Sequence, residues 1–156
     1  MVELTIESLG ARGDGIAHDG TGTIYVPHGA PGDRVAATLT GKRGDGRLAR
    51  LDAVLRPGPD RVEPSCRHFG LCGGCAMQHL NGRAYKDWKL NILCQALARR
   101  DLGSTVIKEM ITMPTASRRR ARFAALRMRN GVQLGFNESG SHKIIKFKQD
   151  GTFVGE

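Results

Sequence analysis

Short runs of alternating apolar and polar residues fill the first 58 positions of the chain. Residues 2–7 alternate with a period of two, as a half-buried strand does. Further extended runs occupy 23–26, 34–39 and 48–55, and glycine-rich turns separate them. Short strands at this spacing predict a small closed barrel, because closure removes the exposed strand edges. The length fits a five-stranded barrel of the oligonucleotide-binding type.

The pattern changes after the last of these runs. Three prolines within residues 56–64 cannot continue a strand or a helix, so we place a domain boundary here. From Asn81 the apolar residues recur at helical spacing, and Asn81 itself is a suitable N-cap. We expect an amphipathic helix over 81–103, with Gly103 in the left-handed position after its end. The apolar stripe consists of Tyr85, Trp88, Ile92 and Ala96, flanked by Leu90, Leu93 and Leu97.

After Pro114 the pattern is again typical of strands. Residues 123–128 and 132–136 flank Arg129-Asn130-Gly131, which indicates a hairpin. We expect a three-residue loop that pairs Met128 with Val132 and places Arg127 and Arg129 together on one face, because a slip of one residue would exchange the faces. The glycines between residues 13 and 22 are interpreted as turn residues rather than as a dinucleotide-binding loop.

The positive charge of the chain is concentrated in its second part. The net charge is +9; residues 1–60 hold 7 Lys/Arg against 8 Asp/Glu, and residues 61–156 hold 17 against 7. An arginine-rich segment with no acidic residue within it carries much of this excess. Guanidinium groups pair well with phosphate oxygens, so the segment indicates an RNA phosphate-binding surface, although a solvated strand face would show the same pattern. Its members are Arg118, Arg119, Arg120, Arg122, Arg127 and Arg129.

Three of the four cysteines lie within ten residues, as Cys66-x5-Cys72-x2-Cys75. Gly73 and Gly74 stand inside the tight pair and would let the backbone wrap a metal centre. Three thiolates in one loop suit an iron–sulfur cluster or a zinc ion, and either needs a fourth ligand. Three buried, inert thiols are the alternative interpretation.

Three other residues are candidates for that fourth position. His68 and His79 lie close enough in sequence to complete a zinc site. Cys94 would need its helix to pack on the loop, and its apolar neighbours favour a small buried thiol instead. In the first 58 residues, Tyr25, His28 and Arg34 are possible RNA contacts, although Tyr25 could equally be a core residue.

Several motifs together resemble the RNA uracil-5 methyltransferase family. The cysteine segment matches in Phe69-Gly70, Cys72-Gly73-Gly74-Cys75 and Gln78-His79-Leu80, and the helix matches in Tyr85, Lys86 and Trp88. Gly15–Gly20, Val26-Pro27 and Pro31-Gly32-Asp33 resemble the TRAM domain, an RNA-binding β-barrel. Arg119–Phe123 and Leu134–His142 are similar to the start of the family's central β region. The resemblance covers residues 1 to about 144.

The resemblance implies a mainly β fold with an α+β extension and a division into four segments. These are a TRAM barrel with an oligonucleotide-binding type of fold (1–58), a linker with the cysteine loop (59–80), the helix (81–103) and a partial central β domain with a tail that departs from the family pattern (104–156). It also implies that Cys66, Cys72 and Cys75 bind a [4Fe-4S] cluster, whose fourth ligand in the family is a downstream cysteine that this chain lacks. Zinc is the alternative metal.

The family methylates C5 of uracil with S-adenosylmethionine, after a cysteine attacks C6. None of those catalytic or cofactor motifs occurs here, so we expect a truncated chain that binds structured RNA, ribosomal or transfer, without catalysing methylation alone. The alternative is a non-catalytic RNA-binding module with a structural metal. A zinc-ribbon adaptor would show two paired knuckles, and a methylthiotransferase would show Cys-x3-Cys-x2-Cys. We expect a cytoplasmic monomer with no membrane segment and no DNA target.

Overall fold

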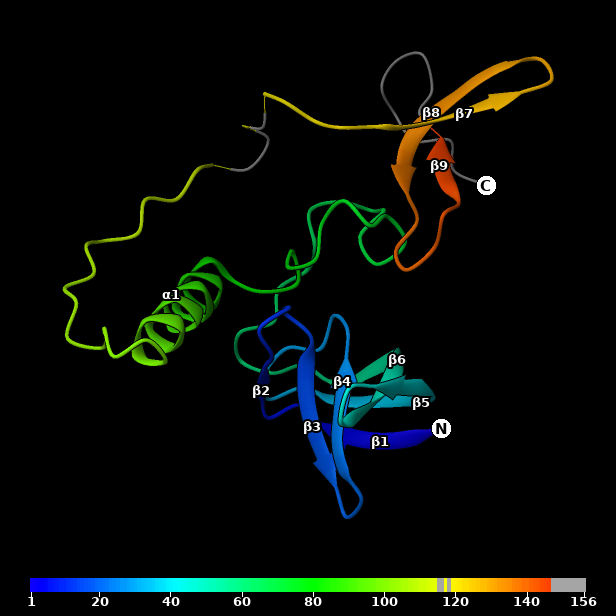
Figure 1. Cartoon of the computed structure of the whole chain (residues 1–156). Helices are drawn as coiled ribbons and strands as arrows, with labels where there is room; N and C mark the ends of the chain where they lie inside the picture. Colours follow the sequence, from blue (N-terminus) through cyan, green and yellow to red (C-terminus); the bar gives the residue numbers. More distant parts are fainter. Residues whose placement is uncertain (115–116, 118, 147–156) are drawn as a thin grey trace. The chain divides into compact units, whose positions relative to one another are not determined.

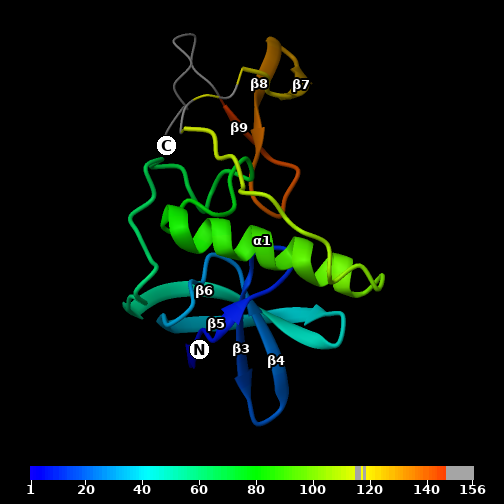
Figure 2. The ribbon, with the colours of Figure 1, turned by 90° about the vertical axis from the view of Figure 1, so that its left-hand side faces the viewer.

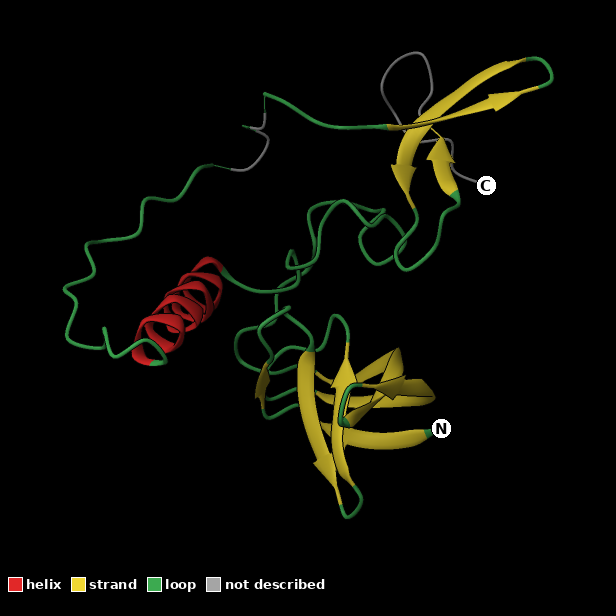
Figure 3. Cartoon of the chain, viewed as in Figure 1, coloured by secondary structure: helices red, strands yellow, loops and turns green. Residues whose placement is uncertain are grey.

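The computed structural model describes residues 1–114, 117 and 119–146. The chain forms two compact units (Figure 1). The first unit consists of Met1–Ser65 and Met77–Met110, and the second consists of Cys66–Ala76 and the chain from Ile111 onward. Strands and loops dominate both units, and the described residues contain a single α-helix (Figure 3). The mainly β fold with an α+β extension is confirmed.

The first unit contains one mixed sheet of six strands. In chain order these are β1 (Val2–Thr5), β2 (Ser8–Leu9), β3 (Gly15–Asp19), β4 (Gly22–Val26), β5 (Arg34–Arg43) and β6 (Gly46–Arg56). Their spatial order is β1-β5-β6-β4-β3-β2, with antiparallel neighbours except for the parallel pair β4–β6. Within the described part of the chain no ladder joins β1 to β2, so the sheet differs from the closed five-stranded barrel that we predicted.

The two edge strands of this sheet are nevertheless successive parts of one stretch. β1 pairs with β5, and β2 pairs with β3, at opposite ends of the strand order. Between them, the backbone N–H of Ile6 donates to the carbonyl of Asp33 (2.8 Å), and that of Glu7 donates to the carbonyl of Ile16 (2.8 Å). The N-terminal stretch therefore supplies both edges of the sheet, which leaves less open edge than separate edge strands would.

Alternation of side chains builds the core inside this sheet. Ile24 and Val26 on β4 are fully buried, while Tyr25 between them is only half-buried, as a period of two requires. The remaining core residues come from β1, β3, β5 and β6 and from the stretch between β1 and β2: Leu4, Ile6, Ala17, Val35, Ala37 and Ala49. The sequence predicted four of the six strands. It missed β2, which has only two residues, and β3, because we interpreted Gly15 as a turn residue. A Cβ at Gly15 would lie 2.9 Å from Cγ2 of Ile6, so packing requires the glycine.

The helix α1 (Gly82–Ala98) begins where the sequence predicted and ends earlier. The side chain of Asn81 accepts from the backbone N–H of Ala84 (2.8 Å), which confirms the N-cap. At the other end Arg99 is the C-cap, and Asp101 rather than Gly103 takes the left-handed conformation (φ 59°). The N–H of Leu102 then donates back to the carbonyl of Leu97 (3.0 Å), which satisfies one of the last helical carbonyls.

Within the first unit, α1 lies to one side of the six-stranded sheet (Figure 2). One aromatic side chain joins the helix to the loop after β2. The indole N–H of Trp88 donates to the carbonyl of Gly10, directly after β2, at 2.9 Å. No residue of α1 is fully buried, and Cys94 is exposed, so our expectation of a buried thiol there is wrong. The helix is half-buried along its apolar stripe, at Tyr85, Trp88 and Ile92. Cys94 is not part of this stripe, so its side chain remains exposed. None of the described helices has the length and apolar character that crossing a membrane requires.

The second unit contains a three-stranded antiparallel sheet of β7 (Ala124–Met128), β8 (Gly131–Asn137) and β9 (Ile144–Lys146). Met128 pairs with Gly131 and Arg127 pairs with Val132, so Arg129 and Asn130 alone form the loop. The register therefore differs by one residue from the predicted one. Gly131 explains the difference, because its φ of 135° lets it pair with Met128 instead of standing in the loop.

Candidate functional site: the cysteine loop and the arginine hairpin

The segment Cys66–Ala76, here named the cysteine loop, is organised by short-range backbone hydrogen bonds. The N–H of Phe69 donates to the carbonyl of Cys66 (3.0 Å). The N–H groups of Leu71 and Cys72 both donate to the carbonyl of His68, at 3.2 and 2.9 Å. The loop therefore consists of consecutive tight turns and brings its first and second cysteines onto one compact segment.

The cysteine loop is also hydrogen-bonded to the end of β8 and to the residues that follow it. The N–H of Gly73 donates to the carbonyl of Asn137 (2.9 Å), and the N–H of Ser139 donates to the carbonyl of Leu71 (2.8 Å). A Cβ at Gly73 would lie 3.0 Å from the carbonyl oxygen of Asn137, so a glycine permits this close approach. Sequence reasoning placed the loop beside the helix in chain order and missed this attachment to the hairpin.

The three thiols of the loop differ in exposure. Cys72 is buried, Cys66 is half-buried and Cys75 is exposed. The N–H of Gly74 donates to Sγ of Cys72 (3.4 Å). The described residues include no group of three thiol, imidazole or carboxylate side chains arranged to hold a metal ion.

The alternative fourth ligands lie in different surroundings. His68 is on the loop, and its Nε2 is 3.1 Å from Nε of Arg67. His79 is fully buried in the first unit, where burial, with a contribution from the charge of Arg61, lowers its pKa to about 4. Its neutral form is therefore the one present at neutral pH. Cys94 is exposed on α1.

The arginine hairpin, defined here as residues 119–137, carries the predicted basic residues on an exposed surface. Arg119, Arg120 and Arg122 precede β7, Arg127 lies on it, and Arg129 is in the turn; all five are exposed. Arg118 lies outside the described residues. No acidic residue occurs between positions 110 and 137. Within the described parts of the chain none of the five takes part in an ion pair, so their guanidinium groups are available to an external anion.

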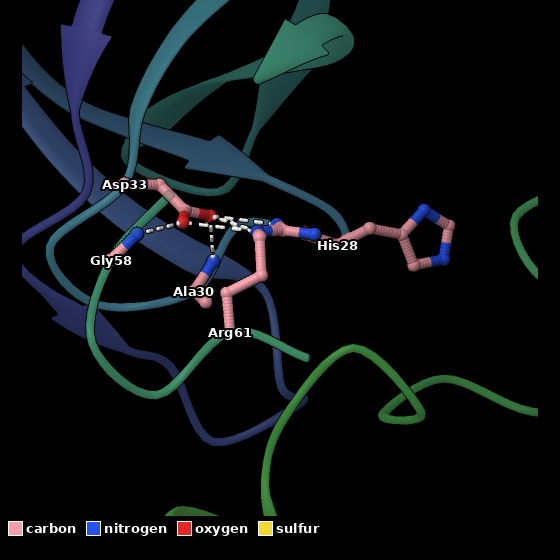
Figure 4. A network of polar contacts seen from close by, with 5 residues as sticks. All are labelled: His28, Ala30, Asp33, Gly58 and Arg61. Carbon is pink, nitrogen blue, oxygen red and sulfur yellow. Dashed lines mark hydrogen bonds and ion pairs between the residues drawn. The ribbon is translucent and has the colours of Figure 1, made fainter. Parts of the chain in front are cut away.

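A second polar site lies in the first unit, at the junction between the sheet and the proline-rich segment (Figure 4). The fully buried carboxylate of Asp33 accepts from the backbone N–H of Ala30 (2.7 Å) and of Gly58 (2.8 Å). Nε and Nη2 of Arg61 donate to the same carboxylate, and Nη2 also donates to the carbonyl of His28 (2.5 Å). A Cβ at Gly58 would lie 2.2 Å from the carbonyl oxygen of Pro31, so only glycine allows this approach.

Burial and hydrogen bonding set the protonation states of Asp33 and His28 in this network. Burial alone would raise the pKa of Asp33, but the hydrogen bonds from Arg61, Gly58 and Ala30 together lower it, so the carboxylate stays ionised. Burial lowers the pKa of His28, whose ring meets that of His79 edge to face at 6.1 Å. The network therefore serves to fix the segment after β6, and we assign it no ligand.

The other possible RNA contacts of the first unit have protein partners. The hydroxyl of Tyr25 donates to Asp45 (3.4 Å), and the guanidinium of Arg43 lies 5.3 Å from the centre of the Tyr25 ring. Arg34 is exposed and pairs with Glu3 at 2.6 Å. Their availability to RNA stays a prediction.

Comparison with known proteins gives matches over nearly the whole chain. No family model matches it. The chain is 43% identical over 143 residues to an uncharacterized RNA methyltransferase of Brucella suis, and the match covers 92% of this chain and 33% of that protein. It is 35% identical over 145 residues to the 23S rRNA (uracil(1939)-C(5))-methyltransferase RlmD of Alkalilimnicola ehrlichii, covering 89% of this chain and 32% of the enzyme.

Among solved structures, the tRNA (uracil-54, C5)-methyltransferase of Pyrococcus abyssi in complex with S-adenosyl-L-homocysteine matches with a TM-score of 0.43. The identity is 28%, over 62% of this chain and 21% of that one. The chain thus spans about a third of the length of the curated relatives it matches. Over about nine tenths of its length the chain is thus similar to curated RNA methyltransferases, among them a uracil-C5 enzyme.

Proposed function

We propose that this chain is the RNA-binding and cluster-binding portion of an S-adenosylmethionine-dependent RNA uracil-C5 methyltransferase. The observation that carries the proposal is the match to such enzymes over about nine tenths of the chain. We assign none of the described residues a catalytic role. The contributions of this portion are then to bind structured RNA, ribosomal or transfer, and to hold a metal cluster in the cysteine loop.

The arginine hairpin supports the RNA-binding part of the proposal. Five exposed arginines lie within eleven residues of sequence, and the nearest acidic residues are Glu109 and Glu138. Such an unbroken basic surface releases counterions from a phosphate backbone when it binds. Arginine forks also pair with two phosphate oxygens at once, which lysine cannot do. We propose that Arg119, Arg120, Arg122, Arg127 and Arg129 contact RNA phosphates, together with Arg118.

Salt titration tests this assignment. We expect the affinity for a structured RNA to fall steeply with salt, and each phosphate-contacting arginine replaced by glutamine to reduce the slope of log K against log salt by about 0.7–0.9. The variants are Arg120→Gln and Arg127→Gln. Arg83→Gln is the matched control, because Arg83 is 89% exposed on α1 and lies outside the hairpin. Affinity that is flat with salt, or equal slopes in all three variants, would remove the RNA assignment.

The donor chemistry of the cysteine loop fits a thiolate-bound cluster. Three thiols lie on one eleven-residue segment, and a backbone N–H donates to the sulfur of Cys72. Hydrogen bonds to cluster sulfurs are one way in which proteins tune such centres. Since the thiols are not arranged as a metal-binding group in this structure, we propose that cluster binding draws Cys66, Cys72 and Cys75 together. Metal binding that organises its own site is common in small metal-binding segments.

Metal analysis tests this part of the proposal independently of RNA. Iron with sulfide supports the [4Fe-4S] assignment, and zinc without iron supports the alternative, a structural zinc site in a non-catalytic RNA-binding module. If protein purified without oxygen contains neither metal, the cysteine loop does not bind a cluster. Binding of RNA would remain to be judged on its own.

A further inference from the structure

A hollow of about 480 Å³ lies within the second unit, between the cysteine loop and the arginine hairpin. Its volume is within the ordinary range for small-ligand sites, roughly 300–1,000 Å³. Gly73 and Gly74 line it from the loop, and Phe123, Phe136 and Arg122 line it from the hairpin. Neither the phosphate contacts nor the cluster proposed above uses the two phenylalanines.

The two rings form an aromatic surface that is partly open to solvent. Their centres are 5.1 Å apart and their planes meet at 41°. Phe123 is 50% exposed, although a phenylalanine ring is among the side chains that gain most from burial. Other apolar side chains of the hairpin are as exposed, such as Leu126 at 49%, so the two rings are distinguished by their place beside the hollow rather than by exposure alone.

Glycine leaves room beside these rings. A Cβ at Gly74 would lie 3.6 Å from Cδ2 of Phe136, so backbone without a side chain faces the ring there. Gly140, which also lines the hollow, has nothing within 4 Å of its Cβ position. The hollow is therefore lined by two aromatic rings and by glycines that add no side chain beside them.

The surrounding charge selects the kind of ligand. Arg122 lines the hollow and is adjacent in sequence to Phe123, while Arg119 and Arg120 are exposed just before it. Glu138 is the acidic residue of the lining, and its carboxylate accepts from the hydroxyl of Ser141 (2.7 Å).

An aromatic ring beside a row of guanidinium groups is the arrangement by which proteins bind single-stranded nucleic acid, with bases stacked on rings and phosphates paired with cations. We propose that this hollow receives one unstacked nucleobase of RNA, which stacks on Phe123 while Arg122 pairs with a flanking phosphate. This inference rests on the proposed RNA-binding function.

Stacking alone carries little sequence preference, because every base has a π-face. The hollow would thus hold a single-stranded nucleotide in place rather than identify it. A protein segment that inserts an apolar side chain would fit the exposed ring as well, but it gives no reason for the neighbouring arginines.

The test compares the 156-residue chain and its variants with two single-stranded RNA oligomers about ten nucleotides long. One is oligoadenylate, and the other has the same backbone with abasic positions. We expect the intact protein to bind oligoadenylate more tightly. Phe123→Ala should weaken its binding by about 5- to 150-fold and leave binding of the abasic oligomer and the salt slope unchanged. Phe123→Trp should retain the affinity, because it keeps a ring.

Leu126→Ala is the matched control, since Leu126 is 49% exposed on the same hairpin and does not line the hollow. The inference is overturned if the intact protein binds both oligomers equally, or if Phe123→Ala and Leu126→Ala have the same effect. If the protein binds both oligomers equally and this binding still falls steeply with salt, the stacking site is overturned but the phosphate contacts are not. The same result is expected if the hollow takes a protein side chain instead of a base. Absence of salt-dependent binding to either oligomer would overturn the RNA-binding function and the stacking site together.

Discussion

The guanidinium of Arg61 holds the buried carboxylate of Asp33 through two nitrogens, Nε and Nη2, at 2.9 and 2.7 Å from the same oxygen. Asp33 is 0% exposed, and the side chain of Arg61 is 17% exposed. Removing one partner of such a pair leaves an uncompensated charge away from water, which is more costly than the pair itself is stabilising.

We therefore expect Arg61→Ala to lower the free energy of unfolding by roughly 3–5 kcal/mol, measured by urea denaturation. Glu3→Ala is the control, because the pair between Glu3 and Arg34 is exposed on both sides and should contribute about 0–1 kcal/mol. Equal losses in the two variants would show that burial of the Asp33 carboxylate does not matter.

Acid should destabilise the first unit through His79. Burial lowers the pKa of this histidine from 6.5 to about 4, so the unfolded chain binds a proton between these values while the folded chain does not. The contribution of neutral His79 to the free energy of unfolding is up to about 3 kcal/mol. It is complete above pH 6.5 and is lost as the pH falls toward 4. His28 shifts in the same direction. His79→Gln should flatten the dependence of unfolding free energy on pH across this window, and an unchanged dependence would contradict the assignment.

The helix start should be sensitive to a single side chain. Asn81 caps the N–H of Ala84, and its Nδ2 donates to Asp60 at 2.9 Å. Asn81→Ala should cost about 0.5–2 kcal/mol in thermal or urea unfolding. Asn91→Ala, an exposed change within α1, should be neutral or slightly stabilising, because alanine is the better helix former. A cost at Asn91 as large as that at Asn81 would argue against the cap.

The cysteine loop should lose its order when one of its thiols is replaced. Serine offers a hard oxygen in place of a soft thiolate and binds iron or zinc poorly. Cys72→Ser should therefore lower the metal content and speed proteolysis within Cys66–Ala76. Cys94→Ser should match the unmodified protein, since Cys94 is exposed on α1. Cleavage at the same rate in both variants would mean that metal does not organise the loop.

Local sequence patterns predicted most of the strands and the helix, but few of the contacts between them. Period-two alternation identified β1, short extended runs between glycine-rich turns identified β4, β5 and β6, and Asn81 identified the start of α1. Each of those signals is contained within a few residues. The hairpin register and the end of α1 depended on which residue adopts a positive φ. The structure places Gly131 in the pairing ladder and Asp101 in the left-handed position, and neither choice is visible in a hydrophobic pattern.

The candidate site shows the same division. The three cysteines and the arginines are recognisable by spacing and charge. The attachment of Gly73 to Asn137 joins residues 64 positions apart, and the contact of Phe123 with Phe136 depends on strand pairing. Such relationships appear only once the fold brings distant segments together. The glycines between Cys72 and Cys75 and a phenylalanine beside an arginine run were the available signals.

Iron, acid-labile sulfide and zinc content, measured on protein purified without oxygen and accompanied by a visible spectrum, tests the central assignment most directly. We expect iron and sulfide in equal amounts, with a broad visible absorption that bleaches on reduction, and loss of both in Cys72→Ser but not in Cys94→Ser. Protein free of iron and sulfide, with or without zinc, would contradict the assignment of Cys66, Cys72 and Cys75 to an iron–sulfur cluster.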